Sequence, residues 1–213
     1  MQHDSLYYST LDHMLRRKLV AVIRMDDPGR AREAVEAIIE GGISIIEVTL
    51  TTPDAISLIT SFAQRPELLV GAGTVLDKEA ALEAISAGAR FLASPITDNG
   101  MIEAVGKSGL VSMPGAYTPT EIVAASRAGA DIIKIFPMPA DGAAYISSLL
   151  APLPHLRLAP SGGVTASTAP LLLAAGAAAL NVGTWLTHQP GGVPASPERI
   201  RERTASLMAA LYK

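Results

Sequence analysis

The chain of 213 residues contains no cysteine. This absence excludes disulfide bonds, thiolate metal ligands and cysteine nucleophiles. Charged residues make up only 17% of the chain, and 20 acidic against 17 basic residues give a formal net charge of −3. Because there is no basic surplus to attract phosphate backbones, we expect no nucleic-acid partner.

Long apolar segments are also missing. The longest apolar run, residues 171–180, contains a glycine and is far shorter than the roughly 20 residues that cross a bilayer. The amino-terminal stretch is polar and has no apolar core of a signal peptide. We therefore expect a cytoplasmic protein without a membrane partner. With 49% apolar residues, the chain can form one domain, residues 1–213, around a sizeable core.

Glycines recur directly before short apolar runs. Those at positions 42, 88, 109, 129 and 176 are separated by 46, 21, 20 and 47 residues, so two intervals are about twice the others. Prolines precede apolar runs inside both long intervals, and LVAVIR begins the series. A glycine between a helix and a strand indicates a left-handed helix cap. The pattern therefore divides the chain into eight units of strand and helix.

The apolar runs have few polar residues, which indicates strands buried on both faces of a parallel sheet. Capping side chains before proline predict helix starts at Asp27-Pro28, Thr52-Pro53, Thr118-Pro119 and Ser196-Pro197. Eight such units predict an α/β fold, a compact (β/α)8 TIM barrel over about residues 18–213. A doubly wound sheet is the competitor, but the G-x-G-x-x-G turn is absent. A short helix near 10–18 precedes the predicted strands 19–24, 43–50, 68–72, 90–94, 110–114, 131–136, 156–160 and 178–183.

Lys134 stands in the middle of a predicted barrel strand, where neither face is wet. Burial disfavours the ammonium form and so favours an amine that can attack a carbonyl carbon. The alternative is a lysine that extends to the rim or pairs with a carboxylate. The strand alone does not decide between these two interpretations.

Glu47 lies in a second buried strand, where a carboxylate without a partner is costly. A pair between Glu47 and Lys134 would satisfy both groups and place a proton-transfer group beside an amine nucleophile. The pair could be purely structural, but two such residues in one barrel favour catalysis. Arg24 ends the first strand, where its guanidinium could bind a substrate carboxylate or phosphate, or instead bridge to Glu47.

Other polar and small residues follow the predicted strands. PSGGV (160–164) and VGT (182–184) follow strands seven and eight, which is the usual phosphate site of this barrel. Thr74 and Pro95 end the third and fourth strands, and only their position favours a role. The four histidines occupy none of these positions, so we expect no catalytic metal. Trp185 is interpreted as a packing residue.

The motifs EVTLTTPDA, GAGTV, SP, PGAYTPTE, KIFP and PSGGV occur in this order within about residues 18–188. As an ordered set they resemble the 2-keto-3-deoxy-6-phosphogluconate (KDPG) and 4-hydroxy-2-oxoglutarate (KHG) aldolase family, which includes the phosphogalactonate enzymes. Members of this family are metal-independent class I aldolases with a (β/α)8 fold that usually form trimers. The resemblance implies a homotrimeric lyase that acts on a phosphorylated 2-keto acid without a cofactor.

The resemblance also implies roles for single residues. Lys134 matches the Schiff-base lysine, and Glu47 matches the general acid/base. Many members carry an arginine four residues after this glutamate, where the present chain has Thr51, so Arg24 is assigned to the substrate carboxylate. Together with Arg24, the residues assigned to the substrate carboxylate and the pyruvate pocket are Thr51, Thr74, Pro95 and Phe136. The phosphate-binding residues are Ser161, Gly162, Gly163, Gly183 and Thr184.

These matches predict cleavage of KDPG to pyruvate and glyceraldehyde 3-phosphate, and of 4-hydroxy-2-oxoglutarate to pyruvate and glyoxylate. A phosphogalactonate aldolase is the alternative within the family, although Ser161 is more similar to the phosphogluconate type. A phosphosugar epimerase would need paired acids or histidines at the strand ends, which this chain lacks. A non-catalytic sugar-phosphate binder would be expected to have lost Lys134 or Glu47.

Overall fold

The computed structural model describes residues 2–212, with side chains from residue 6 onward. Strands and helices alternate along the chain, and all the ladders between strands are parallel. The strands are β1 Leu19–Ile23, β2 Ile45–Thr49, β3 Leu69–Gly73, β4 Phe91–Ala93, β5 Val111–Met113, β6 Gly115–Ala116, β7 Ile133–Ile135, β8 Leu158–Pro160 and β9 Leu180–Val182.

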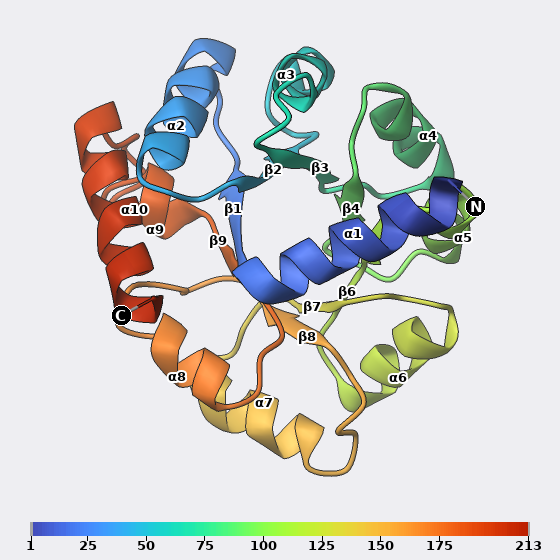
Figure 1. Cartoon of the computed structure of the whole chain (residues 1–213). Helices are drawn as coiled ribbons and strands as arrows, with labels where there is room; N and C mark the ends of the chain where they lie inside the picture. The colour runs from blue at the N-terminus through green and yellow to red at the C-terminus, as the bar shows by residue number, and fades with distance from the viewer. Residues whose placement is uncertain (1, 213) are drawn as a thin grey trace.

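The helices form an outer ring around the strands (Figure 1). α10 follows the last strand and packs against α2, so the end of the chain lies beside its first βα unit. The helices are α1 Gln2–Arg17, α2 Pro28–Glu40, α3 Ala55–Ala63, α4 Lys78–Ser86, α5 Asn99–Lys107, α6 Pro119–Arg127, α7 Gly142–Leu150, α8 Ala169–Ala174, α9 Thr184–Thr187 and α10 Pro197–Leu211. None of these helices is long and apolar enough to cross a membrane.

The sheet curls into a barrel. Six strands pair in the order β5-β4-β3-β2-β1-β9 and three in the order β6-β7-β8. A parallel bridge between Ser161 and Asn181 joins β8 to β9. β5 lies within the predicted strand 110–114, and β6 follows beyond its predicted end, after Pro114, which has no N–H for the ladder. The predicted (β/α)8 fold is confirmed, with its fifth strand in two pieces.

Three of the four predicted helix starts are confirmed. The side chains of Asp27, Thr118 and Ser196 each accept a hydrogen bond from a backbone N–H of the first helical turn. The start at Thr52-Pro53 is wrong, because α3 begins only at Ala55. Thr52 is buried, and its hydroxyl donates to the carbonyl oxygen of Ile23 at 3.3 Å, so this side chain ties two strand ends together instead of capping a helix.

The glycines before the strands are left-handed, as predicted. Gly42, Gly88, Gly109, Gly129 and Gly176 have φ between 65° and 105°. The amino-terminal helix is longer than the predicted 10–18, since α1 spans Gln2–Arg17.

α1 covers the amino-terminal end of the barrel. Its Leu11 and Met14 pack against interior side chains near the starts of the strands, such as Val20, Ile45 and Phe91. In Figure 1 this helix lies in front of the ring of strands. The opposite end, where the strands have their carboxyl termini, is therefore the end that can receive a ligand.

Tyr7 ties α1 to the barrel. Its hydroxyl donates to Asp131 Oδ1 at 2.5 Å, while Asp131 Oδ2 accepts from the backbone N–H and the hydroxyl of Ser112. Burial, and then the bond to Asp131, raise the pKa of Tyr7 to about 12. The neutral phenol is therefore the form that the folded state stabilises.

The Tyr7→Phe variant is expected to lose about 1 kcal/mol of stability near pH 8, because one hydrogen bond to a partly buried carboxylate is removed. A group whose pKa is raised in the folded state loses its contribution as pH rises. Between pH 10 and 12 the natural chain should therefore lose stability faster than Tyr7→Phe does. Thermal unfolding at pH 8 and pH 11 measures both effects. Tyr8→Phe is the matched control, since Tyr8 is 66% exposed and should change neither value.

Candidate active site

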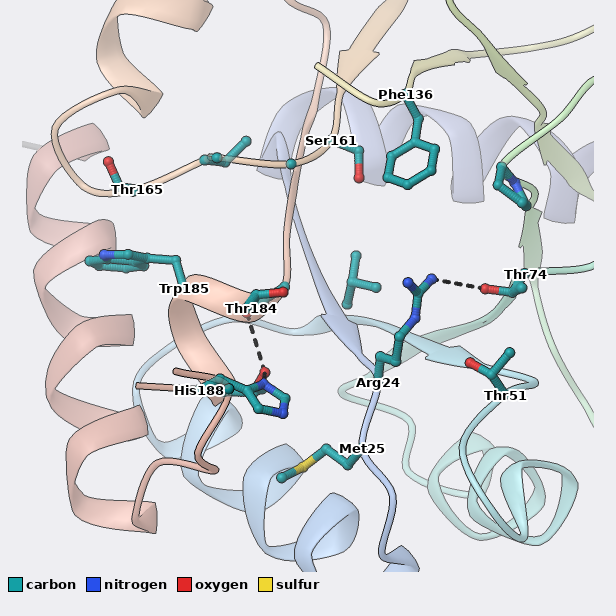
Figure 2. Close-up of a pocket in the computed structure, with 18 of the residues that line it drawn as sticks. Arg24, Met25, Thr51, Thr74, Phe136, Ser161, Thr165, Thr184, Trp185 and His188 are labelled. Carbon is teal, nitrogen blue, oxygen red and sulfur yellow. Dashed lines mark hydrogen bonds between the residues drawn. The ribbon is translucent and has the colours of Figure 1, made fainter. Parts of the chain in front are cut away.

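A cavity of about 880 Å³ opens at the carboxyl ends of the strands. Each part of its wall follows a different strand, from Arg24 after β1 to Thr184 after β9. Figure 2 shows the labelled side chains around this hollow, with Thr51 and Thr74 on one side and Thr184 and Trp185 on the other. Of the predicted site residues, the cavity is lined by Arg24, Thr51, Thr74, Pro95, Lys134, Phe136, Ser161, Gly162, Gly163, Gly183 and Thr184.

The predicted pair of Lys134 and Glu47 is present. Lys134 Nζ donates to Glu47 Oε1 at 3.1 Å, and the two side chains are 5% and 0% exposed. Lys134 lines the cavity, whereas Glu47 lies behind it in the barrel interior. Glu47 Oε2 is buried and has no hydrogen-bond partner among the described residues. One carboxylate oxygen thus holds the amine, and the other can accept a further proton.

The position of Glu47 depends on a glycine of the next strand. β2 and β3 pair in register, with Thr49 opposite Gly73. A Cβ atom at Gly73 would lie only 2.7 Å from both Cγ and Cδ of Glu47. The glutamate side chain therefore occupies the space that a larger residue at position 73 would need.

Arg24 does not bridge to Glu47, which was one interpretation of its position. Its Nη2 donates instead to Thr74 Oγ1 at 3.1 Å (Figure 2). Thr74 has φ 57°, an uncommon conformation for a β-branched residue. Thr51 follows the buried Thr49 by two residues, and the hydroxyl oxygens of the two side chains are 3.1 Å apart. The guanidinium and two hydroxyl groups thus form a polar wall suited to a carboxylate.

The opposite wall is made of glycines and hydroxyl groups. Gly162 and Gly163 are exposed and have φ 102° and 68°, values that favour glycine. Ser161 precedes them, and Gly183 and Thr184 follow the neighbouring strand β9 and line the same wall. Backbone N–H groups and hydroxyls without bulky side chains are suited to a phosphate group. We call residues 161–163 and 183–184 the cradle.

The sequence analysis missed several cavity residues. His188 lines the cavity, so the prediction that no histidine occupies a site position is wrong. Trp185 packs against the hydrophobic core as predicted, but it is half-buried and also lines the cavity, which the prediction missed. Asp26 and Thr165 are further examples. All four lie within six residues after a strand, so examining every polar or aromatic residue within that distance would have found them.

Among residues 6–212, whose side chains the structure describes, no group of three or more histidine, aspartate or glutamate side chains could hold a metal ion. The reactive groups at the cavity include a buried amine beside a carboxylate.

Comparison with known proteins places the chain in one family. The family model for KDPG and KHG aldolase matches residues 11–191. A probable 2-dehydro-3-deoxy-6-phosphogalactonate aldolase of Rhizobium meliloti is 35% identical over 199 residues, which cover 92% of each chain. A 2-dehydro-3-deoxy-phosphogluconate aldolase of Zymomonas mobilis is 30% identical over 190 residues, covering 86% of this chain and 88% of the relative.

A solved structure of KDPG aldolase from Legionella pneumophila, with pyruvate captured at low pH as a covalent carbinolamine intermediate, is also similar. The TM-score is 0.79 at 25% identity, covering 97% of this chain and 98% of that one. Both the sequence and the fold therefore agree on one assignment. The chain belongs to the KDPG and KHG aldolase family and is a lyase.

Proposed function

We propose that the protein is a class I aldolase that cleaves KDPG to pyruvate and glyceraldehyde 3-phosphate, with no metal and no cofactor other than its own lysine. The observation that carries this proposal is the buried pair of Lys134 Nζ and Glu47 Oε1, 3.1 Å apart at the cavity. The Legionella relative, captured with pyruvate as a carbinolamine, supports the same chemistry here.

In the proposed mechanism, the neutral amine of Lys134 attacks the C2 carbonyl carbon of the substrate and forms a carbinolamine. Glu47 supplies the proton with which the C2 oxygen leaves as water, so that an iminium ion forms. The iminium ion accepts the electron pair of the C3–C4 bond when the C4 hydroxyl gives its proton to the carboxylate of Glu47. The aldehyde product then leaves, and a pyruvate enamine remains on Lys134. Protonation at C3 and hydrolysis release pyruvate and restore the amine.

The two walls of the cavity would hold the two ends of the substrate. Arg24, with Thr51 and Thr74, is suited to the carboxylate next to the reacting ketone. Pro95 and Phe136 would enclose the three carbons that become pyruvate, since both line the cavity with Lys134. The cradle would bind the distal phosphate, and this binding energy would orient the C3–C4 bond.

The phosphogalactonate isomer is the second candidate substrate, because the Rhizobium relative is a probable aldolase for that compound. 4-Hydroxy-2-oxoglutarate, cleaved to pyruvate and glyoxylate, is a third and lacks the phosphate. Ser161 lines the cavity and favours the phosphogluconate isomer by its resemblance to that branch. Measuring kcat/KM for the three compounds separately would decide between them.

We also propose that the chain forms a homotrimer, as its resemblance to the family implies. Leu76, Ile96 and Tyr117 are 48%, 49% and 41% exposed. They lie in loops that follow β3, β4 and β6, at one end of the barrel. An interface between copies would cover such apolar side chains. Multi-angle light scattering distinguishes this trimer from a monomer.

The proposed function is tested by borohydride reduction in the presence of pyruvate, followed by intact mass measurement and peptide mapping. A reduced pyruvate adduct on Lys134 is expected. No adduct on a folded protein would refute the Schiff-base mechanism and would favour a barrel that only binds sugar phosphates.

A further inference from the structure

The cradle receives no lysine or arginine from the described wall of the cavity. Lys134 and Arg24 are the lysine and arginine among the described residues that line it. Lys134 is needed at the ketone, and Arg24 reaches toward Thr74, away from Thr184 (Figure 2). A phosphate in the cradle would therefore meet backbone N–H groups and hydroxyls, but neither of these two basic side chains.

His188 also lines the cavity, on the side of the cradle, and a histidine side chain can carry a positive charge. It directly follows α9, whose first residue, Thr184, belongs to the cradle. The backbone N–H of His188 donates to the carbonyl oxygen of Thr184 at 2.9 Å, so the two residues are one helical turn apart. Figure 2 shows both side chains at the same end of the hollow.

The imidazole ring has one nitrogen engaged by the protein. Nδ1 of His188 lies 2.8 Å from the hydroxyl oxygen of Thr187, within hydrogen-bond distance. Nε2 is therefore the nitrogen that remains for a ligand. The Thr187 hydroxyl can donate either to Nδ1 or to the carbonyl oxygen of Gly183, 3.4 Å away. When it donates to Nδ1, or when the ring carries both hydrogens, Nε2–H can donate to a phosphate oxygen.

The backbone that carries this ring is fixed from two directions. Nη1 of Arg203, in α10, donates to the carbonyl oxygens of Trp185 and His188, both at 2.7 Å. On the other side, His188 forms an antiparallel bridge with Pro194, which also lines the cavity. Because the backbone of His188 is already ordered, binding a ligand costs little additional backbone conformational entropy, which favours binding.

We infer that His188 is a phosphate ligand of this enzyme, whose Nε2–H donates to the distal phosphate of the substrate held in the cradle. The inference deepens the proposed function and rests on its assignment of a phosphorylated substrate. It adds a side-chain donor to a site otherwise composed of glycines and hydroxyl groups.

The first test is direct binding of inorganic phosphate, measured by 31P NMR titration of the full chain as purified. His188→Ala should raise the dissociation constant about tenfold or more, as expected for loss of a hydrogen bond to a charged group. His188→Gln, whose side-chain amide can replace Nε2–H, should recover part of the affinity. The matched control is Gln189→Ala, because Gln189 is the exposed neighbour outside the cavity wall. Equal dissociation constants for the natural chain and His188→Ala would overturn the inference.

The second test separates the two ends of the substrate. Exchange of the pyruvate methyl protons with deuterated water requires the lysine end alone, whereas aldol cleavage requires both ends. His188→Ala should raise KM for the phosphorylated substrate about tenfold and leave pyruvate exchange within twofold. An equal loss in both reactions would instead indicate a general structural role and would contradict the inference. If the natural chain exchanges no pyruvate protons, the proposed aldolase fails, and the phosphate titration still decides the role of His188.

Discussion

The Lys134→Met variant is expected to lose aldol cleavage by at least about 10⁴-fold, because removal of a covalent nucleophile leaves only binding to assist the reaction. Methionine keeps a similar length and fills the same space without an amine. Borohydride in the presence of pyruvate should then leave the variant unmodified by mass. Steady-state cleavage and intact mass on the same preparation measure both results.

The same variant should be less stable than the natural chain. Glu47 is 0% exposed and its Oε2 already lacks a partner, so loss of Lys134 would leave a buried carboxylate with no cation. Removing one member of a buried ion pair costs about 3–5 kcal/mol. The double variant Lys134→Met/Glu47→Gln removes both charges and should recover much of the stability without recovering activity. Chemical denaturation of the three chains measures this difference.

Lys107→Ala is the matched control. Lys107 pairs with Glu103 on the surface of α5, where both side chains are mostly exposed. Such a pair contributes about 0–1 kcal/mol, so stability, activity and adduct formation should stay close to those of the natural chain. Persistent cleavage by the folded Lys134→Met variant would contradict the Schiff-base assignment. If the double variant regained activity, the carboxylate rather than the lysine would be the obstacle in the single variant.

The fold could be predicted from the spacing of a few glycines. Glycines before the strands at 42, 88, 109, 129 and 176 all have positive φ, and this local requirement recurs with the period of a βα unit. Local sequence patterns did not predict the features that depend on contacts between different βα units. Thr52 precedes a proline as a helix cap would, yet its hydroxyl bonds to Ile23 in the neighbouring strand. The break between β5 and β6 arises because Pro114 has no N–H to donate to a neighbouring strand, and the sequence alone does not show which neighbour that would be.

The site was predictable only in part, for a related reason. Lys134 and Glu47 stand out because they are charged residues in apolar runs, and 87 positions separate them in the chain. His188 is not in a strand, so no such contrast marks it. Its place at the cavity follows from α9, which ends beside the barrel opening, and from the bridge to Pro194. Neither contact leaves a pattern in the sequence, so the position of His188 six residues after β9 is the one signal that could have indicated it.

The Gly73→Ala variant is expected to lower kcat about 100-fold while it leaves Lys134 in place. The added Cβ would lie 2.7 Å from Cγ and Cδ of Glu47, so the carboxylate must move away from the amine. A displacement of about 1 Å of a catalytic group can cost about 10²-fold in rate. Crowding of this kind also destabilises a packed interior by about 1–3 kcal/mol. Single-turnover cleavage and thermal unfolding measure the two effects separately.

Gly106→Ala is the control for the chemical change itself. Gly106 lies in α5, and a Cβ there would meet nothing within 4 Å, so this variant should gain up to about 1 kcal/mol of helix stability and keep full activity. In Gly73→Ala, borohydride should still trap pyruvate on Lys134, but more slowly, because the amine remains while its proton relay is displaced. A wild-type kcat in Gly73→Ala would show that the reaction does not depend on the position of Glu47. The carboxylate would then be a structural partner of the lysine, and another group would have to move the protons.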